Sequence, residues 1–375
     1  MQPIYLVTIT TVLVQGAHQG SRVVASLLAL GLGANPLVIG LLIGVYSVFP
    51  LMLGVYSGRI SDRLGTRRPM LAGISVLGLG LLVPVIWPTL PALFVSAIFV
   101  GTGFVFFNVS NQNLAGGLGP PEERTRNFST IGLGYSLGHL VGPVTAGYAI
   151  EHLGFRYGYL IFALVAFAAV IWLAFYKRLD VRRPLGTGQR RNTLELLKKP
   201  ELRRVVIVSG LITTGWDLYG FYLPIYGHSI GLSASTIGNI IGVFAIATFI
   251  VRAALPWLTR QFSIERVLAV SAFAAALLFV PFPLVEYVPV LFALSFGIGL
   301  ALGCSQPLTL NLAYNHSPAG RSGEVTGLRL TINNIVHVSV PIAAGGLAAT
   351  LGVAPVFWVS AALLASSGYL SRKPD

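Results

Sequence analysis

The chain has 375 residues, of which 54% are hydrophobic and only 10% charged, and its mean hydropathy is +0.78. Soluble domains carry about a quarter charged residues, so this composition excludes an ordinary soluble protein and indicates a membrane protein. The single cysteine, Cys304, excludes an intrachain disulfide and a thiolate metal cluster. The formal charge of +13 would fit a nucleic-acid partner, but its distribution along the chain argues against one.

Twelve apolar runs, each long enough to cross a bilayer as a helix, follow one another along the chain. A spanning helix needs about 20 mostly apolar residues. The runs are continuous rather than alternating, which favours helices over a β-barrel. We therefore expect an all-α polytopic membrane protein with transmembrane helices at residues 4–31, 37–57, 69–88, 91–113, 127–149, 156–176, 203–226, 234–256, 267–284, 287–310, 325–347 and 353–371.

Positive charge is concentrated in alternate connections between these spans. If the N-terminus is cytoplasmic, all of the 25 Lys and Arg except Arg22 and Arg156 fall on the cytoplasmic side or at the adjoining ends of spans. This is the positive-inside asymmetry of multi-pass membrane proteins. The first run is too long for a signal-peptide core and lacks a clear cleavage site. We expect a protein of the cytoplasmic (inner) membrane with both termini in the cytoplasm.

The first span carries a polar stripe along one helical face, at spacings i, i+3, i+4 and i+7. Its members are Gln15, His18, Gln19 and Arg22. Such a stripe is costly against lipid, so it faces protein or a water-filled substrate cavity. A hydrogen-bonded seam between helices is the alternative that suits the glutamines, whereas a buried guanidinium such as that of Arg22 needs an anion.

The connection between the second and third spans holds an acidic residue inside a basic stretch. It resembles the Gly-x-Leu-Ala-Asp-Arg-x-Gly-Arg-Lys signature that major facilitator superfamily proteins carry between these two helices. The matching residues are Gly58, Asp62, Arg63 and Gly65, with Arg67 at the position of the lysine.

The resemblance implies a gating role for this segment. In the superfamily the aspartate, here Asp62, faces the cytoplasmic N-terminal end of the eleventh helix, where free N–H groups and the helix dipole favour an anion. Breaking that contact opens the inward face. The alternative, that residues 59–68 only supply inside-positive charge, leaves Asp62 and the two glycines unexplained.

The fourth span carries Asn108 and Gln112 on one face near its cytoplasmic end, and both are candidates for the substrate cavity. The fifth span resembles the Gly-x-x-x-Gly-Pro-x-x-Gly-Gly element of the superfamily's drug–proton antiporters, which implies a close, kinked helix contact between the two halves. The residues that carry this likeness are Gly138, Gly142, Pro143 and Gly147. Ala97 stands where such exporters usually carry a fourth-helix arginine.

The second half of the chain repeats the first with a constant shift of 198 residues, as Gly40 and Gly238 show. Self-similarity at one fixed shift is the signature of an internal duplication. The other pairs are Asn113 with Asn311, Pro120 with Pro318, His139 with His337, Pro143 with Pro341, Gly147 with Gly345 and Gly154 with Gly352.

The duplication divides the chain into an N-terminal six-helix bundle at residues 1–176, a cytoplasmic interdomain loop at 177–202 and a C-terminal bundle at 203–375. Two pseudo-symmetric six-helix bundles with a substrate site between them are the fold that the resemblance implies. Residues 193–199 can form a short interfacial helix on their leucines. We expect a monomer.

Asp217, in the seventh span, is the one acid deep in any predicted span. The repeat places it at the depth of Gln19, within a turn of Arg22, so an ion pair between Arg22 and Asp217 is reasonable in the superfamily's fold. Asp217 is also a candidate proton carrier, and a purely structural pair is the third possibility. Trp216 beside it is a candidate substrate contact.

His139 and His337 occupy equivalent positions in the two halves and are further proton-coupling candidates. Their symmetric placement equally suits an inherited structural role. Asn334, near His337 in the eleventh span, is a candidate for the substrate cavity.

Secondary transport explains these features best. An enzyme is disfavoured because there is no nucleophile elbow, phosphate loop or metal-ligand cluster, and we expect no cofactor and no metal. The main hypothesis is a proton-coupled exporter of drugs or amphipathic metabolites that works by alternating access. Two alternatives stay open: transport of a polar solute such as a sugar or organic acid, and a non-transporting receptor. The expected partners are a small-molecule substrate, protons and the lipid bilayer, but no nucleic acid.

Overall fold

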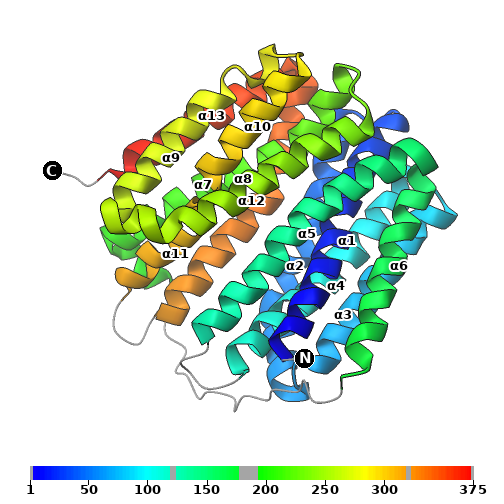
Figure 1. Ribbon diagram of the computed structural model, residues 1–375, viewed down its shortest axis with the longest axis horizontal. Helices are drawn as coiled ribbons and strands as arrows, with labels where there is room; N and C mark the ends of the chain where they lie inside the picture. Colours follow the sequence, from blue (N-terminus) through cyan, green and yellow to red (C-terminus); the bar gives the residue numbers. More distant parts are fainter. Residues whose placement is uncertain (1–2, 119–123, 177–192, 318–321, 373–375) are drawn as a thin grey trace. The chain divides into compact units, whose positions relative to one another are not determined.

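The computed structural model describes residues 3–118, 124–176, 193–317 and 322–372. All regular structure in these ranges is helical, as the sequence predicts (Figure 1). The chain forms two compact units. The first comprises Met1–Gly188 and Gly231–Gly242, and the second comprises Gln189–Ile230 and Val243–Asp375.

The first unit contains six complete helices and the beginning of a seventh. These are α1 (Pro3–Gly31), α2 (Pro36–Leu64), α3 (Arg67–Ile86), α4 (Leu90–Gly117), α5 (Arg124–Leu153), α6 (Phe155–Ala174) and the first residues of α8 (Ala234–Gln261).

The second unit contains the rest of α8 and the remaining helices. These are the 3₁₀ helix η2 (Thr193–Lys198), α7 (Pro200–Ser229), α9 (Ile264–Phe279), the 3₁₀ turn η3 (Phe282–Leu284), α10 (Val288–Gly303), α11 (Ser305–Asn315), α12 (Ser322–Leu351) and α13 (Ala354–Ser371). The short helix expected at residues 193–199 is therefore η2, and it buries Leu196. The predicted interdomain loop otherwise lies at residues 177–192, outside the described residues.

Ten helical segments of the described chain are long and apolar enough to cross a membrane. The first and fifth predicted spans, which correspond to α1 and α5, are not among them. Both helices carry buried polar residues, such as Gln15 on α1, which lower their hydropathy without preventing a helix from spanning inside a bundle.

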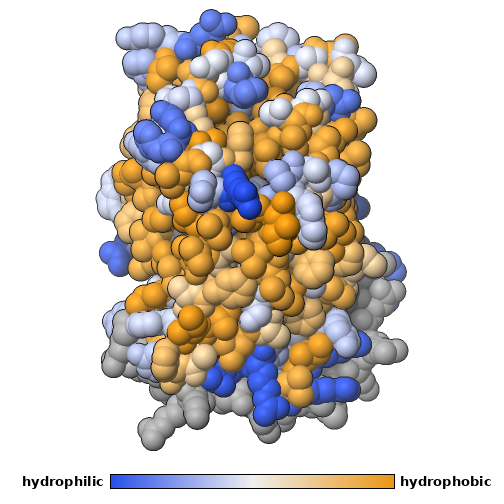
Figure 2. Space-filling view, turned by 90° about the vertical axis from the view of Figure 1, so that its right-hand side faces the viewer, coloured by the Kyte–Doolittle hydropathy of each residue, from blue (hydrophilic) through white to orange (hydrophobic). Residues whose placement is uncertain are grey.

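The outer surfaces of the helices are apolar. Leu164 and Ile171 on α6 are 59% and 58% exposed, and Leu277 on α9 is 73% exposed. Figure 2 shows one face of the molecule, on which hydrophobic residues cover a broad middle zone and hydrophilic residues gather towards both ends. A surface of this kind is stable only against lipid tails, so the chain is a multi-pass integral membrane protein.

The tenth predicted span is not one continuous helix. It breaks at Cys304 into α10 and α11, and the break leaves backbone carbonyls without helical donors. Two side chains of the second unit supply those donors: Trp216 Nε1 lies 3.3 Å from the oxygen of Leu302, and Arg252 Nε lies 3.1 Å from that of Gly303. These long-range contacts stabilise a break that hydropathy cannot reveal.

Glycines bring α5 against α1, its neighbour in the first unit (Figure 1). A Cβ added to Gly142 would lie 2.5 Å from the oxygen of Gly16, and one added to Gly138 would lie 2.6 Å from Cβ of Gln15. At these two positions the antiporter-like element therefore packs helices of the same unit, whereas the resemblance implies a contact between the two halves.

The end of the same element contacts a helix that belongs to the second half of the sequence. A Cβ added to Gly147 would lie 2.4 Å from the oxygen of Ala234 on α8, and one added to Gly238 would lie 2.6 Å from the oxygen of Pro143. The contact uses the first residues of α8, which are part of the first unit. Of the four residues of the element, Pro143 and Gly147 are the ones that these close approaches place against α8.

Candidate functional site

Asp217 forms an ion pair with His337 inside the second unit. Its Oδ2 lies 2.6 Å from Nδ1 of His337, and these side chains connect α7 to α12, which lie side by side (Figure 1). Asp217 is buried, whereas His337 is half-buried.

The ion pair belongs to a polar seam between α7 and α12, which we call the C-terminal seam. Ser209 and Thr213 precede Asp217 on α7 at intervals of four residues, and Asn333 precedes His337 on α12 at the same interval, so each set lies on one helical face. The hydroxyl of Ser209 donates to Oδ1 of Asn333 at 3.1 Å. The sequence favours Arg22 as the partner of Asp217 instead; Arg22 belongs to the other unit, and that pair stays a prediction.

An equivalent N-terminal seam joins α1 to α5 in the first unit. Nε2 of Gln15 lies 2.9 Å from Nε2 of His139, and Nε2 of Gln19 lies 3.3 Å from the same atom. Each of these contacts places the amide of a glutamine against the same ring nitrogen of His139. The two glutamines therefore make the contacts expected of a hydrogen-bonded seam between helices, which was the alternative to a substrate cavity. The repeat shift of 198 residues relates Gln19 to Asp217 and His139 to His337.

The residues of the polar stripe on α1 have different neighbours. His18 turns away from the N-terminal seam and stacks on Phe104, with 4.0 Å between the ring centroids. Arg22 is half-buried and interacts electrostatically with Tyr46. A stripe on one helical face thus divides between several neighbouring helices.

The two polar candidates of α4 take part in a neutral hydrogen-bond network. Nε2 of Gln112 donates to Oδ1 of Asn108 at 3.1 Å, and the hydroxyl of Tyr135 also donates to that oxygen. Asn111 donates to Tyr135 at 3.1 Å and to Thr11 at 3.0 Å. Their neighbours are side chains of the same unit, so a role as substrate contacts is still a prediction.

The other two cavity candidates lie in the second unit. Trp216 is half-buried against Phe244, with 4.8 Å between ring centroids, in addition to its bond at the α10–α11 break. Asn334 is half-buried beside Asn333. The contact of Trp216 with the helix break gives it a structural role that the sequence did not indicate, and a substrate role for either residue is untested.

Arg329 on α12 is a functional candidate that sequence reasoning missed. Its place near the end of a span groups it with the cytoplasmic charges, but it is only 5% exposed. Its Nη1 donates to Ser209, Gln306 and Thr309 at 3.2, 3.3 and 3.5 Å, so it lies on the C-terminal seam. The repeat shift could have found it, because that shift places Arg329 on Ile131 and thus marks a charge without a counterpart.

The signature between the second and third spans is mostly helical, which corrects our expectation of a loop at residues 59–68. α2 runs to Leu64, and α3 begins at Arg67. Gly65 has a φ of +83°, a backbone conformation that favours glycine, and this explains the second glycine of the signature.

Each remaining member of the signature has its own surroundings. Gly58 lies on α2 against Val109, and Arg63 is exposed. Arg67 donates from Nε to the oxygen of Tyr176 at 3.1 Å and from Nη2 to that of Ala174 at 2.8 Å, so it caps the C-terminal end of α6. The side chain of Asp62 lies outside the described residues, and its gating contact stays a prediction.

The end of α5 meets the start of α8 through a carboxylate. Oε2 of Glu151 accepts from the backbone N–H of Ser235 at 3.0 Å, near the N-terminus of α8, where free N–H groups favour an anion. Hydrogen bonds from Ser235 hold the pKa of the Glu151 carboxyl below its usual value. This hydrogen bond and the close approach at Gly147 hold the C-terminal end of α5 against the N-terminal end of α8.

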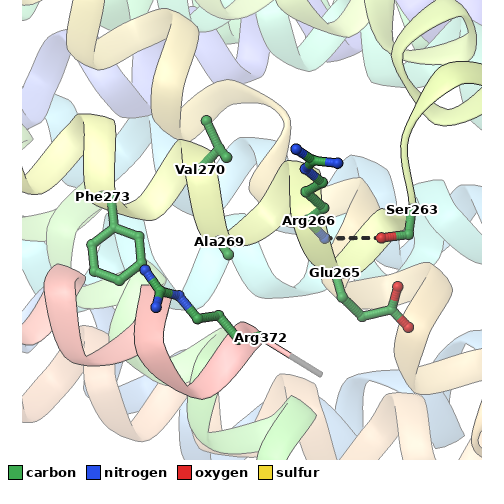
Figure 3. Close-up of a pocket in the computed structure, with 7 residues that line it drawn as sticks. All are labelled: Ser263, Glu265, Arg266, Ala269, Val270, Phe273 and Arg372. Carbon is green, nitrogen blue, oxygen red and sulfur yellow. Dashed lines mark hydrogen bonds between the residues drawn. The ribbon is translucent and has the colours of Figure 1, made fainter. Parts of the chain in front are cut away.

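A cavity of about 370 Å³ lies at the start of α9 (Figure 3). Ser263 caps this helix by accepting from the backbone N–H of Arg266 at 3.3 Å, and Arg372 extends over the ring of Phe273, 4.8 Å from its centroid. None of the sequence candidates lines this cavity. Among the described residues, no three His, Cys, Asp or Glu side chains cluster as a metal site would require.

The comparisons with known proteins agree with the fold. Residues 7–341 match the model of the Major Facilitator Superfamily. The chain is 26% identical over 349 residues to the multidrug resistance protein MdtG of Dickeya zeae, covering 88% of this chain and 83% of that protein. It is 21% identical over 345 residues to YuxJ of Bacillus subtilis, an uncharacterized MFS-type transporter, covering 86% of this chain and 84% of YuxJ.

Solved structures show the same fold at low sequence identity. A crystal structure of the nucleoside transporter NupG superposes with a TM-score of 0.82 at 14% identity, covering 98% of both chains. A crystal structure of a peptide transporter of the POT type gives 0.82 at 17% identity, covering 98% of this chain and 93% of that one. The family match, the helical architecture and the membrane-facing surface lead to one conclusion: the chain belongs to the major facilitator superfamily and is a membrane transporter, not an enzyme.

Proposed function

We propose that this transporter is a proton-coupled exporter of drugs or amphipathic metabolites in the cytoplasmic membrane. The observation that carries the proposal is the 2.6 Å contact between the buried Asp217 and the half-buried His337, which connects two helices. The names of the MdtG relatives, at about a quarter identity, support export of drugs rather than uptake of a nutrient.

The geometry suggests how a proton would act. When Asp217 is ionised and His337 is protonated, α7 and α12 are held together by a charge-assisted hydrogen bond. Protonation of Asp217 removes the negative charge and weakens that bond. A change in one bond between two helices can bias a transporter with two conformations of similar free energy. In this proposal the Asp62 contact is a second, separate gate at the cytoplasmic side.

Transport of a polar solute is the second candidate, and the neutral networks of the first unit favour it. Gln15, Gln19 and Asn108 present amides of the kind that bind hydroxyl-rich solutes. Deleting the gene discriminates between the candidates. Cells should become sensitive to hydrophobic toxins if the protein is a drug exporter, whereas loss of growth on a single polar solute would favour the second candidate.

The direct test uses purified protein in proteoliposomes. An imposed pH gradient should drive ethidium, an amphipathic dye, against its concentration gradient, and nigericin, which collapses the pH gradient, should stop the movement. Counterflow of labelled ethidium in the absence of a pH gradient serves as the control for folded carrier. Counterflow that continues at the same rate with and without a pH gradient, with no accumulation, would overturn the proton coupling.

A further inference from the structure

Arg329 is a buried cation whose hydrogen-bond partners among the described residues are all neutral. Its hydrogen bonds reach the hydroxyl groups of Ser209 and Thr309 and the amide oxygen of Gln306, and all of them use Nη1. Among the side chains that the structure describes, no carboxylate lies within ion-pair distance of it. Burying an unpaired guanidinium is costly, so a protein that does so usually obtains an anion from elsewhere.

One edge of the guanidinium has no hydrogen-bond partner among the described residues. Nε of Arg329 is buried and has no hydrogen-bond partner, and Nη2 has none among the described residues. Nε and Nη2 form the side of the group that carboxylates and phosphates take with two parallel hydrogen bonds. Thr309, which contacts Nη1, is the one member of the cluster that lines a cavity of about 320 Å³, and the charged side chains of that lining are Glu201, Arg204 and Glu265.

The repeat shows that the fold does not need this charge. In the first unit the positions of Ser209, Gln306 and Thr309 are occupied by Thr11, Asn108 and Asn111, and Asn111 donates to Thr11 and to Tyr135, which in turn donates to Asn108. The counterpart of Arg329 there is Ile131, which is buried and apolar. Because the corresponding cluster of the first unit is uncharged, the helices of this fold can pack at these positions without a cation.

We propose that Arg329, with Ser209, Gln306 and Thr309, binds the oxyanion group, carboxylate or phosphate, of the transported molecule. The inference rests on the proposed function and adds amphipathic organic anions to its substrates. The guanidinium edge supplies two donors and the positive charge, and the neighbouring hydroxyl and amide groups hold the guanidinium in place.

Binding of three matched probes tests the proposal. The protein is placed in nanodiscs of zwitterionic lipid, and isothermal titration calorimetry measures its affinity for 2-naphthoate, 2-naphthyl phosphate and the neutral 2-naphthamide. We expect at least one anion to bind about tenfold or more tightly than the amide, the scale of a hydrogen bond to a charged group. Equal affinity for all three probes would overturn the proposal, and tight binding of inorganic phosphate alone would assign the site to a free ion.

Variants locate the preference at Arg329. Arg329→Gln should remove the preference for the anion and leave amide binding unchanged, and Arg329→Lys should retain part of it because the charge remains without the planar edge. Arg260→Gln, at an exposed arginine of α8, is the matched control and should change nothing. If Arg329→Gln fails to fold, the proposal is tested by the preference of the unmodified protein for the anionic probes over the amide and by the partial loss of that preference in Arg329→Lys.

Two further measurements separate the possible failures. If a carboxylate of the chain, such as that of Asp62, fills the site in another conformation, Asp62→Asn should strengthen binding of the anionic probe. That result would identify an internal partner and overturn the assignment to substrate. Proton-driven movement of ethidium, a cation, in a protein that shows no anion preference would leave the proposed exporter intact while rejecting the anion site.

Discussion

The N-terminal and C-terminal seams occupy equivalent positions but differ in charge. In the first unit Gln19 and His139 form a neutral contact at 3.3 Å, whereas in the second unit Asp217 and His337 form an ion pair at 2.6 Å. The repeat shift pairs His139 with His337 and Gln19 with Asp217, so one seam has a carboxylic acid where the other has an amide. The comparison teaches that two equivalent helix contacts can differ by a single functional group, and in the proposed function that group confines the proton step to the second unit.

Packing differs between the seams as well. Gly138 and Gly142 allow α5 to approach α1 closely, whereas the repeat places Val336 and Val340 at the equivalent points of α12. Larger side chains keep helix backbones apart. We infer that the N-terminal seam is a tightly packed scaffold and that the C-terminal seam has room for rearrangement.

The largest effect is expected from a substitution that removes the carboxylic acid of the C-terminal seam and leaves an amide, as in the N-terminal seam. Asp217→Asn should reduce proton-driven ethidium transport to background while counterflow continues, because exchange requires only reorientation of the loaded carrier. Proteoliposome assays with and without a pH gradient measure both. Loss of counterflow together with driven transport, in a protein with a lowered melting temperature, would instead make the pair structural.

Matched histidine variants sharpen the comparison. His337→Gln should lower driven transport by roughly tenfold, the value of one hydrogen bond to a charged group, because Asp217 loses its partner. His139→Gln should have little effect on coupling, since a glutamine can replace one neutral bond of that seam. The two variants are compared in the same proteoliposome assay, and equal losses would mean that both seams carry the proton.

A buried charge at Arg329 should also be visible as a stability cost. Arg329→Met is expected to be neutral or to stabilise the protein by roughly 1–4 kcal/mol, because an apolar side chain of similar length avoids desolvating an unpaired guanidinium. Ile131→Met, at the equivalent apolar position, is the control and should cost less than about 1.5 kcal/mol. Chemical unfolding in mixed micelles measures both, and a strong destabilisation by Arg329→Met would show that the arginine holds the seam together.

The close approach of α1 and α5 predicts moderate effects of opposite sign at two glycines. Gly142→Ala places a methyl group 2.5 Å from the oxygen of Gly16 and should destabilise the protein by about 1–3 kcal/mol. Gly132, on the same helix, has nothing within 4 Å of its added Cβ, so Gly132→Ala should stabilise by roughly 0.5–1 kcal/mol. Thermal unfolding of the two variants in the same detergent tests the packing difference.

The smallest effect concerns the end of α5, where Glu151 has Ala349 as its counterpart on α12. The pKa of Glu151 is lowered from 4.5 by its bonds to Ser235, so its contribution to stability is complete above pH 4.5 and is lost as the pH falls through the lowered pKa. Glu151→Gln should therefore lower the melting temperature slightly at neutral pH and not at all at strongly acidic pH. A difference that persists at low pH would mean that the carboxylate charge is not involved.

The sequence by itself determined the fold class and the family, and it identified Gln15, His18 and Asp217 as polar residues inside the spans. Hydropathy reports where helices cross lipid, and a constant repeat shift reports which positions correspond, because both signals are local or additive along the chain. The signature that contains Gly58 and Gly65 indicates the family because its residues are neighbours in the sequence.

Partner choice was decided only by the tertiary structure. Periodicity placed Gln15, His18 and Asp217 on helical faces, but it could not say that His18 turns to Phe104, or that Asp217 has His337 as its partner. The break at Cys304 and the burial of Arg329 were equally hidden, because each depends on side chains contributed by other helices. The hydrogen bond between Asp217 and His337 joins residues 120 positions apart, and no pattern within one span encodes it.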